Sequence, residues 1–189
     1  MKKILALTLP AVLLLALLCA CGGGETKKVD LTDFYATLSE KYQVPATPEQ
    51  DYPDELADND DLWLDGPDSR EDRIKALEER RDQLRQMSLD AYPGLAGISA
   101  RQCLAYVSLM SFSGAELVLV QVSDKADADA VKSILQTRVD AQLDGGTWYE
   151  EAVKNWRDNA RIVSNGSYVM LIVSEDCDAI VSEFNDLFK

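Results

Sequence analysis

The sequence predicts an α+β fold, namely a four-stranded antiparallel sheet with helices packed on it and a helical extension at the N-terminus. Residues 95–189 show the order strand, strand, helix, strand, strand, helix (ββαββα). Adjacent strands joined by short turns predict hairpins, and each helix has one apolar stripe that needs a sheet face. We expect both helices on one face of the sheet, which leaves the other face open to the N-terminal helix.

Four short runs have the composition of strands, at residues 102–110, 115–123, 161–164 and 167–174. Ser111 to Gly114 joins the first two runs into a predicted hairpin. Asn165-Gly166 joins the last two runs, and it predicts a type I′ turn because both central residues of that turn need a positive φ. The sequence therefore predicts two hairpins that together form the sheet.

Two helices of this domain are predicted from apolar residues at helical spacing. One covers about residues 126–143 and ends at Gly145-Gly146, and the other covers about residues 176–188. Their inward residues are Val131, Ile134, Leu135, Val139 and Leu143 in the first helix, and Cys177, Ile180, Val181, Phe184 and Leu187 in the second.

Three aromatic residues, Trp148, Tyr149 and Trp156, lie in or beside a short helix between these two. Aromatic side chains at helical spacing beside a sheet are usually part of the core, so we expect all three to be buried. Stacking on a glycan or a peptide is the alternative role for them.

Three segments precede the α+β domain. Residues 30–44 predict an amphipathic helix, residues 45–68 an extended acidic linker or long loop, and residues 69–92 a charged helix. The linker is expected because prolines and clustered like charges oppose regular structure. The charged helix is expected to begin at a capping box, Ser69 with Asp72, and to be half solvated because its apolar residues are sparse.

The N-terminus has the features of an export signal. Two lysines precede roughly 15 mostly apolar residues, which suit a signal peptide better than the ~20 needed to cross a bilayer. The run Leu18-Cys19-Ala20-Cys21 follows, and it resembles the lipobox of bacterial lipoproteins. The resemblance implies that residues 1–20 are removed, that Cys21 carries the lipid, and that residues 21–29 form a linker. An uncleaved anchor helix, or a signal peptide cut elsewhere, is the alternative.

Cys103 and Cys177 are the cysteines that follow the lipobox. In an oxidising compartment they could form one disulfide, which would close a long loop and add ~4 kcal/mol in the chain-entropy model. Both residues also fit as small apolar members of the core. The sequence leaves both interpretations open.

The chain is strongly acidic, with a formal net charge of −14, and without residues 1–20 it has 17 basic against 33 acidic side chains. Nucleic-acid recognition needs clustered lysine and arginine, so we expect no nucleic-acid partner. Cationic peptides, metal ions or basic patches of envelope proteins would be attracted. The charge also fits a surface that simply resists aggregation.

Catalytic patterns are scarce. The sequence contains no histidine, which excludes Ser-His-Asp and Cys-His nucleophiles and histidine zinc sites. Paired carboxylates could hydrolyse glycosides, and Asp58 to Asp61 with Asp65 could either bind calcium or form a solvated acidic loop, although Leu62 occupies the third ligand position of a calcium loop. We expect a non-catalytic binding or interaction module with no cofactor and no metal; a carboxylate-based hydrolase or a calcium-dependent binder is the alternative.

Several further motifs accompany the lipobox: Asp30-Leu31, Ser113-Gly114-Ala115-Glu116, Arg138 with Gln142, Trp148-Tyr149 and Gly166-Ser167-Tyr168-Val169. Together they resemble an uncharacterised family of bacterial lipoproteins, mostly from anaerobic Gram-positive bacteria, with one C-terminal domain of unknown function. The resemblance implies lipid anchoring on the extracytoplasmic face of the cell membrane and reduced cysteines. For the binding module itself we expect an envelope protein, a peptide or a glycan as partner. It assigns no activity.

The same resemblance marks Arg138 and Gln142, which lie one helical turn apart. Their functional role would be a ligand contact at the end of the helix. Their structural role would be either a pair on the helix surface or a buried arginine that neighbours near Asp140 and turn carbonyls satisfy. We favour the structural role.

Overall fold

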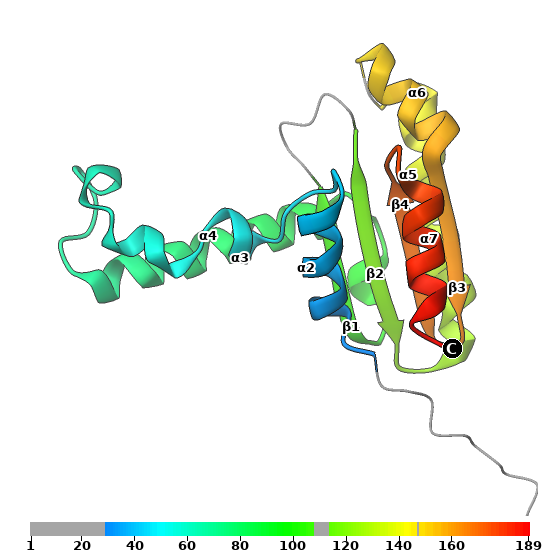
Figure 1. Ribbon diagram of the computed structural model, residues 1–189, viewed down its shortest axis with the longest axis horizontal. Helices are drawn as coiled ribbons and strands as arrows, with labels where there is room; N and C mark the ends of the chain where they lie inside the picture. Colours follow the sequence, from blue (N-terminus) through cyan, green and yellow to red (C-terminus); the bar gives the residue numbers. More distant parts are fainter. Residues whose placement is uncertain (1–28, 108–113, 147) are drawn as a thin grey trace, which may run out of the picture.

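The computed structural model describes residues 29–107, 114–146 and 148–189, and it confirms the predicted fold class. A single four-stranded antiparallel sheet has the order β1-β2-β4-β3, as Figure 1 shows. The strands are β1 (Ala100–Val107), β2 (Glu116–Val122), β3 (Ala160–Asn165) and β4 (Tyr168–Val173). The central strands, β2 and β4, are buried along their whole length.

The two predicted hairpins differ in what the structure shows of their turns. β1 pairs with β2, but the predicted connection at residues 111–114 falls largely on residues 108–113, which lie outside the described residues. In the second hairpin Asn165 pairs with Tyr168, so the central residues of the turn are Gly166 and Ser167. Only Gly166 has a positive φ, 61°, which is the pattern of a type II′ turn. The predicted type I′ turn is therefore wrong, because Asn165 is the last residue of β3.

Helices cover both faces of the sheet. α2 (Leu31–Lys41) and α7 (Cys177–Asp186) lie on one face, and α5 (Ala128–Ala141) and α6 (Glu150–Asn159) lie on the other. The expectation that the two C-terminal helices share a face is wrong. The reason is that β2 and β4 are apolar on both faces, so each face needs a cover.

Each face of the sheet has its own apolar core. The core under α2 and α7 includes Leu31, Tyr35, Leu38, Leu117, Leu119, Met170, Ile172, Ile180 and Phe184. The core under α5 and α6 includes Tyr92, Leu95, Val118, Val120, Val131, Leu135, Trp156, Val169 and Leu171. Side chains alternate between these two sets along β2 and β4, as the pleat of a strand requires.

The start of α2 is fastened to the edge strand β1. Asp30 caps the helix by accepting a hydrogen bond from the backbone N–H of Thr32 at 2.9 Å. The side chain of Gln102 accepts from the backbone N–H of Leu31 at 3.1 Å and donates to Asp30 at 3.3 Å. These contacts satisfy helix N–H groups that have no partner within the helix, and they hold the N-terminal helix on the sheet.

The acidic segment is not an extended linker. It forms α3 (Pro48–Asp51) and two 3₁₀ turns, η1 (Asp54–Asp58) and η2 (Asp60–Leu62), which lie along the charged helix α4 (Arg70–Asp90). α4 begins after Ser69, whose side chain accepts from the backbone N–H of Asp72, which is one half of the predicted capping box. The Asp72 carboxylate accepts from the Ser69 hydroxyl at 2.6 Å instead of from the Ser69 backbone. Residues 48–85, here called the arm, extend away from the sheet (Figure 1).

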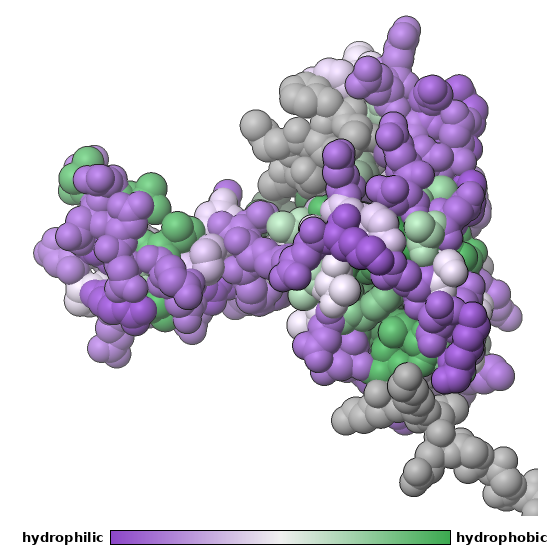
Figure 2. All heavy atoms as spheres, in the orientation of Figure 1, coloured by the Kyte–Doolittle hydropathy of each residue, from purple (hydrophilic) through white to green (hydrophobic). Residues whose placement is uncertain are grey.

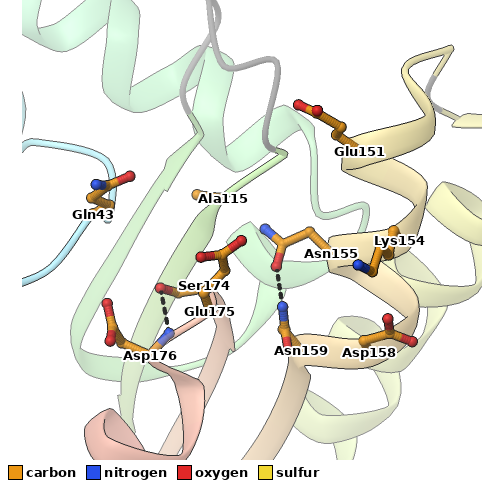
Figure 3. A pocket seen from close by; sticks show the side chains of 10 residues that line it. All are labelled: Gln43, Ala115, Glu151, Lys154, Asn155, Asp158, Asn159, Ser174, Glu175 and Asp176. Atoms are coloured by element: carbon orange, nitrogen blue, oxygen red, sulfur yellow. Dashed lines mark hydrogen bonds between the residues drawn. The ribbon is translucent and has the colours of Figure 1, made fainter.

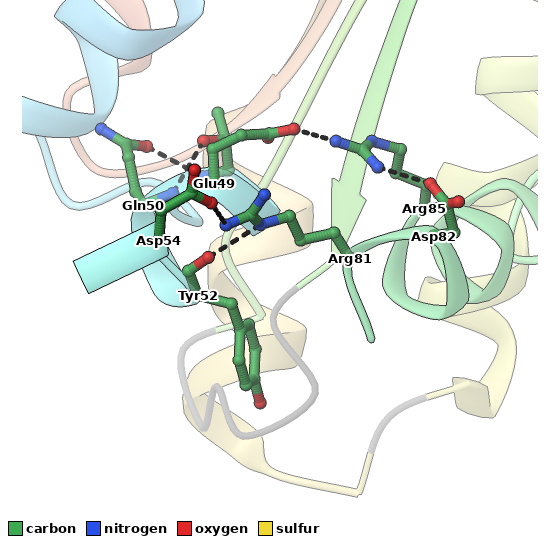
Figure 4. Close-up of polar contacts among 8 residues, drawn as sticks. Glu49, Gln50, Tyr52, Asp54, Arg81, Asp82 and Arg85 are labelled. Atoms are coloured by element: carbon green, nitrogen blue, oxygen red, sulfur yellow. Dashed lines mark hydrogen bonds and ion pairs between the residues drawn. The ribbon is translucent and has the colours of Figure 1, made fainter. Parts of the chain in front are cut away.

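Ion pairs explain why this segment folds back. The acidic residues between 45 and 68 have no basic neighbour in the sequence, but the arginines of α4 supply the missing charge. The pairs are Glu49 with Arg85, Asp54 with Arg81, Asp58 with Arg70, and Asp60 with Arg73. Two of them, made by Arg81 and Arg85, are drawn in Figure 4.

Candidate functional site

A polar groove lies at the end of the sheet where β2 begins and β4 ends. It encloses about 660 Å³ between α6 and the turn from β4 into α7. Figure 3 shows the side chains of α6 along one side and the turn residues 174–176 along the other. The sheet creates this site because antiparallel pairing brings Glu116, the first residue of β2, beside Val173, the last residue of β4.

Hydrogen bonds fix the inner wall of the groove. The side chain of Asn159 donates to the side chain of Asn155 at 2.8 Å, and the backbone N–H of Asp176 donates to the Ser174 hydroxyl at 3.2 Å. Asn155 and Ser174 are both buried. Their positions are therefore set by the fold, and the groove offers fixed amide and hydroxyl groups to a ligand.

Charged side chains surround this wall, and most of them are acidic. Glu151 and Asp158 come from α6, and Glu175 and Asp176 come from the turn before α7. All four are exposed at the rim. Among the described residues, Lys154 is the one basic side chain that lines the groove. The rim therefore favours cationic groups.

The structure places Arg138 beneath this region, in a buried ion pair. Its guanidinium binds the carboxylate of Glu116 through two nitrogens: Nη2 contacts Oε1, and Nε donates to Oε2 at 3.2 Å. The hydroxyl of Tyr92 donates to the same carboxylate. The guanidinium also lies 5.7 Å from the ring centroids of Tyr92 and Trp156. The expected partners near Asp140 are wrong, because the arginine points to β2.

Burial and pairing act in opposite directions on Glu116. Burial raises the pKa of this carboxyl, while Arg138 and Tyr92 work against that rise by binding the charged form. Among the described residues, Glu116 is the one acidic side chain that is buried. A charge at such a position needs a partner within the fold, so this cluster joins β2, α5 and the chain after α4.

Sequence reasoning missed Glu116 and Tyr92 as partners of Arg138. One signal could have found the pair: Glu116 is the one charged residue of β2, in which Gln121 is the one other polar residue. A carboxylate in a strand that is buried throughout predicts a buried basic partner. Tyr92 had no such signal, because it was interpreted as the end of a helix.

Gln142 lies at the C-terminal end of α5, away from the groove. It is buried at the start of the π-helical turn η5 (Gln142–Gly146). The backbone of Gly146 lies close to Ala141 and Gln142. A Cβ atom at this position would lie 2.5 Å from the carbonyl oxygen of Ala141 and 2.9 Å from Nε2 of Gln142. Neither Arg138 nor Gln142 lines the groove.

Cys103 and Cys177 do not form the suggested disulfide. Both thiols are free in the structure. Side chains alternate along β1, so Cys103 lies on the same face of the sheet as Ala105, which belongs to the core under α5. Cys177 belongs to the core under α7, on the other face. The sheet separates the two side chains. Cys21 lies outside the described residues.

The aromatic prediction was right for one residue of three. Trp156 is 1 % exposed and part of the core. Trp148 is 94 % and Tyr149 53 % exposed, so the prediction that they are buried is wrong. They precede α6 instead of lying on its inward stripe, with Tyr149 at the N-cap position.

The proposed calcium ligands are engaged elsewhere. The carboxylates of Asp58 and Asp60 bind Arg70 and Arg73, so a metal ion would have to displace these arginines. In the described part of the chain, no group of three or more acidic or cysteine side chains is placed to hold a metal ion. In the same part, no helix has the length and apolar composition to span a membrane.

Residues 94–174 match a family model described as a domain of unknown function (DUF4358). The match covers the four strands, α5 and α6, and it includes Glu116 and Arg138. α2, the arm and α7 lie outside it. No curated protein and no solved structure matches the chain.

Proposed function

We propose that the protein is a lipoprotein held at the extracytoplasmic face of the cell membrane through Cys21, and that it binds a cationic peptide segment in the groove without catalysing a reaction. The anchor is supported by the lipobox sequence before Cys21. The DUF4358 domain would supply the α6 side of the groove, Glu175 and Asp176 directly after it would supply the other side, and the residues after the anchor would supply the tether.

The observation that carries the proposal is the placement of the groove's charges. Two carboxylates lie on α6 and two on the turn before α7, with the fixed side chains of Asn155 and Ser174 between them. A lysine or arginine side chain in the groove would meet carboxylates from both walls. Its backbone would meet amide and hydroxyl groups that are already positioned, which lowers the cost of binding.

The hydrolase alternative lacks this support. A general acid needs a carboxyl whose pKa is raised and which can reach the substrate. Burial raises the pKa of Glu116, but this side chain is bound by Arg138 and Tyr92 and points away from the groove. Ala115, the residue before it, is the one that lines the groove.

Metabolic labelling with a palmitate analogue tests the anchor. We expect label on the wild-type protein in membranes and its loss in Cys21→Ala. A wild-type protein without label, or equal labelling of the variant, contradicts lipid anchoring. The groove could still bind its ligand in that case, because the labelling does not involve it.

Nuclear magnetic resonance titration of residues 22–189 with a tetralysine peptide tests the groove. We expect the amides of α6 and of residues 174–176 to shift, and the shifts to weaken in the double variant Glu175→Gln/Asp176→Asn. The matched control is Asp61→Asn/Asp65→Asn on the arm, which removes the same charge elsewhere. Equal loss in both variants would mean that net charge alone attracts the peptide, and the proposed site would be rejected.

A further inference from the structure

The outer end of the arm exposes two leucines beside a tryptophan. Leu62 is 59 % and Leu64 82 % exposed, while Trp63 between them is half-buried. Figure 2 shows apolar residues at this end of an otherwise hydrophilic arm. Single exposed apolar residues are common on protein surfaces. The local structure must therefore show whether these two leucines form a binding surface.

The turn that presents the leucines is held in place by Trp63. The indole N–H of Trp63 donates to the carbonyl oxygen of Leu56 at 2.8 Å, and the guanidinium of Arg73 lies 5.9 Å from its ring centroid. Gly66 packs against the same ring, where a Cβ atom would come within 2.9 Å of Cε3. Because Trp63 is fixed inward, its two neighbours are presented outward on a defined turn.

Exposed acidic residues stand next to these leucines in the sequence. Asp58 and Asp60 are engaged by Arg70 and Arg73. Asp61, Asp65 and Asp68 are exposed, and no basic side chain of the described residues forms an ion pair with them. We call Leu62 and Leu64, with these three aspartates, the arm tip. Its chemistry is an apolar centre with an anionic rim.

An apolar centre with an anionic rim favours some binding partners of the arm tip over others. An anionic membrane would repel the rim. A second copy of this chain also carries a large negative charge, and four arginines of its arm, Arg70, Arg73, Arg81 and Arg85, are already engaged in ion pairs. A protein surface with an apolar pocket and lysine or arginine around it matches both the centre and the rim.

We propose that the arm tip is a docking surface for a second protein, in which Leu62 and Leu64 fill an apolar pocket and the three aspartates meet basic side chains at its edge. The proposal is independent of the groove, because none of the residues that line the groove belongs to the arm. A preformed turn loses little conformational freedom on binding, which favours such an interface.

Site-specific photocrosslinking in membranes of cells that produce the full-length protein tests this proposal. A benzophenone amino acid replaces Leu64 in one variant and Asp140, an exposed residue of α5, in the control. We expect position 64 to form an adduct with one other protein, and the crosslinked peptide to contain apolar residues with lysine or arginine. We expect position 140 not to form it.

Two further variants make the result specific. Asp61→Asn/Asp65→Asn should reduce the adduct several-fold, as should salt at about 0.5 M, where exposed charges are screened. Glu175→Gln in the groove should leave it unchanged. The proposal is overturned if position 64 gives no adduct, a lipid adduct, a dimer of this chain, or a partner peptide without basic residues.

Discussion

The sheet and the arm are held together by different forces. Both faces of β2 and β4 are covered by apolar side chains, and the residues of these two strands are all buried. The arm buries few apolar residues, among them Pro48, Ala57 and Leu77, and relies on ion pairs between its acidic segment and α4. One acidic protein therefore contains a part stabilised by the hydrophobic effect, which the screening of charges by salt does not weaken, and a part that such screening should loosen.

The arginines of the arm are more than surface charges. The side chains of Arg73 and Arg81 are only 13 % and 12 % exposed, although their acidic partners are largely exposed. Arg81 also donates to the carbonyl oxygen of Tyr52 at 2.8 Å, and Figure 4 shows it between that carbonyl and Asp54. Each of these arginines therefore connects backbone and carboxylate of the acidic segment to α4.

The largest effect should come from the ion pair inside the domain. Arg138→Met leaves the Glu116 carboxylate buried without its charged partner, and such a loss costs about 3–5 kcal/mol. Chemical denaturation measures it. Glu116→Leu/Arg138→Met should recover much of the loss, because both charges are then gone. If Arg138→Met changes the free energy of unfolding by less than about 0.5 kcal/mol, the arginine is not structural and its role must lie in binding.

A core substitution should separate the sheet from the arm. Leu171→Ala removes a side chain that is fully buried in β4, and we expect a loss of about 2–5 kcal/mol. Leu64→Ala at the arm tip should change the free energy of unfolding by less than about 0.5 kcal/mol. Comparable losses in the two variants would mean that Leu64 is covered in solution.

A single arginine should control the acidic segment. Arg81→Ala removes the contacts to Tyr52 and Asp54, so amide hydrogen exchange should accelerate in residues 48–58. Protection of β2 and β4 should stay the same, because local opening of the arm does not unfold the sheet. The control is Lys75→Ala, an exposed residue of the same helix. Faster exchange throughout the chain would show that the arm and the sheet unfold together.

The smallest effect concerns two carboxyls. The backbone N–H of Thr32 lowers the pKa of Asp30, and the guanidinium of Arg70 lowers the pKa of Asp58. A lowered pKa means that the charged form stabilises the fold, so this contribution is present above the unfolded value of 3.8 and is lost as the pH falls. At high salt the pKa of Asp58 should return toward its ordinary value more than that of Asp30. Carboxyl titration by nuclear magnetic resonance checks this, and equal salt responses would contradict it.

Local patterns were enough to predict the sheet and the charged helix α4, but not the fold of the acidic segment that lies along α4. The strands follow from short apolar runs, and the helices follow from stripes such as Val131, Leu135 and Val139, because each pattern acts over a few residues. The fold of residues 45–68 depends on arginines that come up to 36 positions later, as for Glu49 and Arg85, and composition alone suggested a linker. The pairing of Arg138 with Glu116, over 22 positions, was missed for the same reason.

Hydrogen exchange at two salt concentrations tests the difference between sheet and arm most directly. Amide exchange of the mature chain is followed by mass spectrometry at about 0.1 M and about 1 M sodium chloride, where the screening length falls from ~10 Å to ~3 Å. We expect residues 48–66 to lose protection at the higher concentration, while β2 and β4 keep theirs. Protection of residues 48–66 that does not depend on salt, or a parallel loss in β2 and β4, would contradict an arm held by ion pairs on a sheet held by its apolar cores.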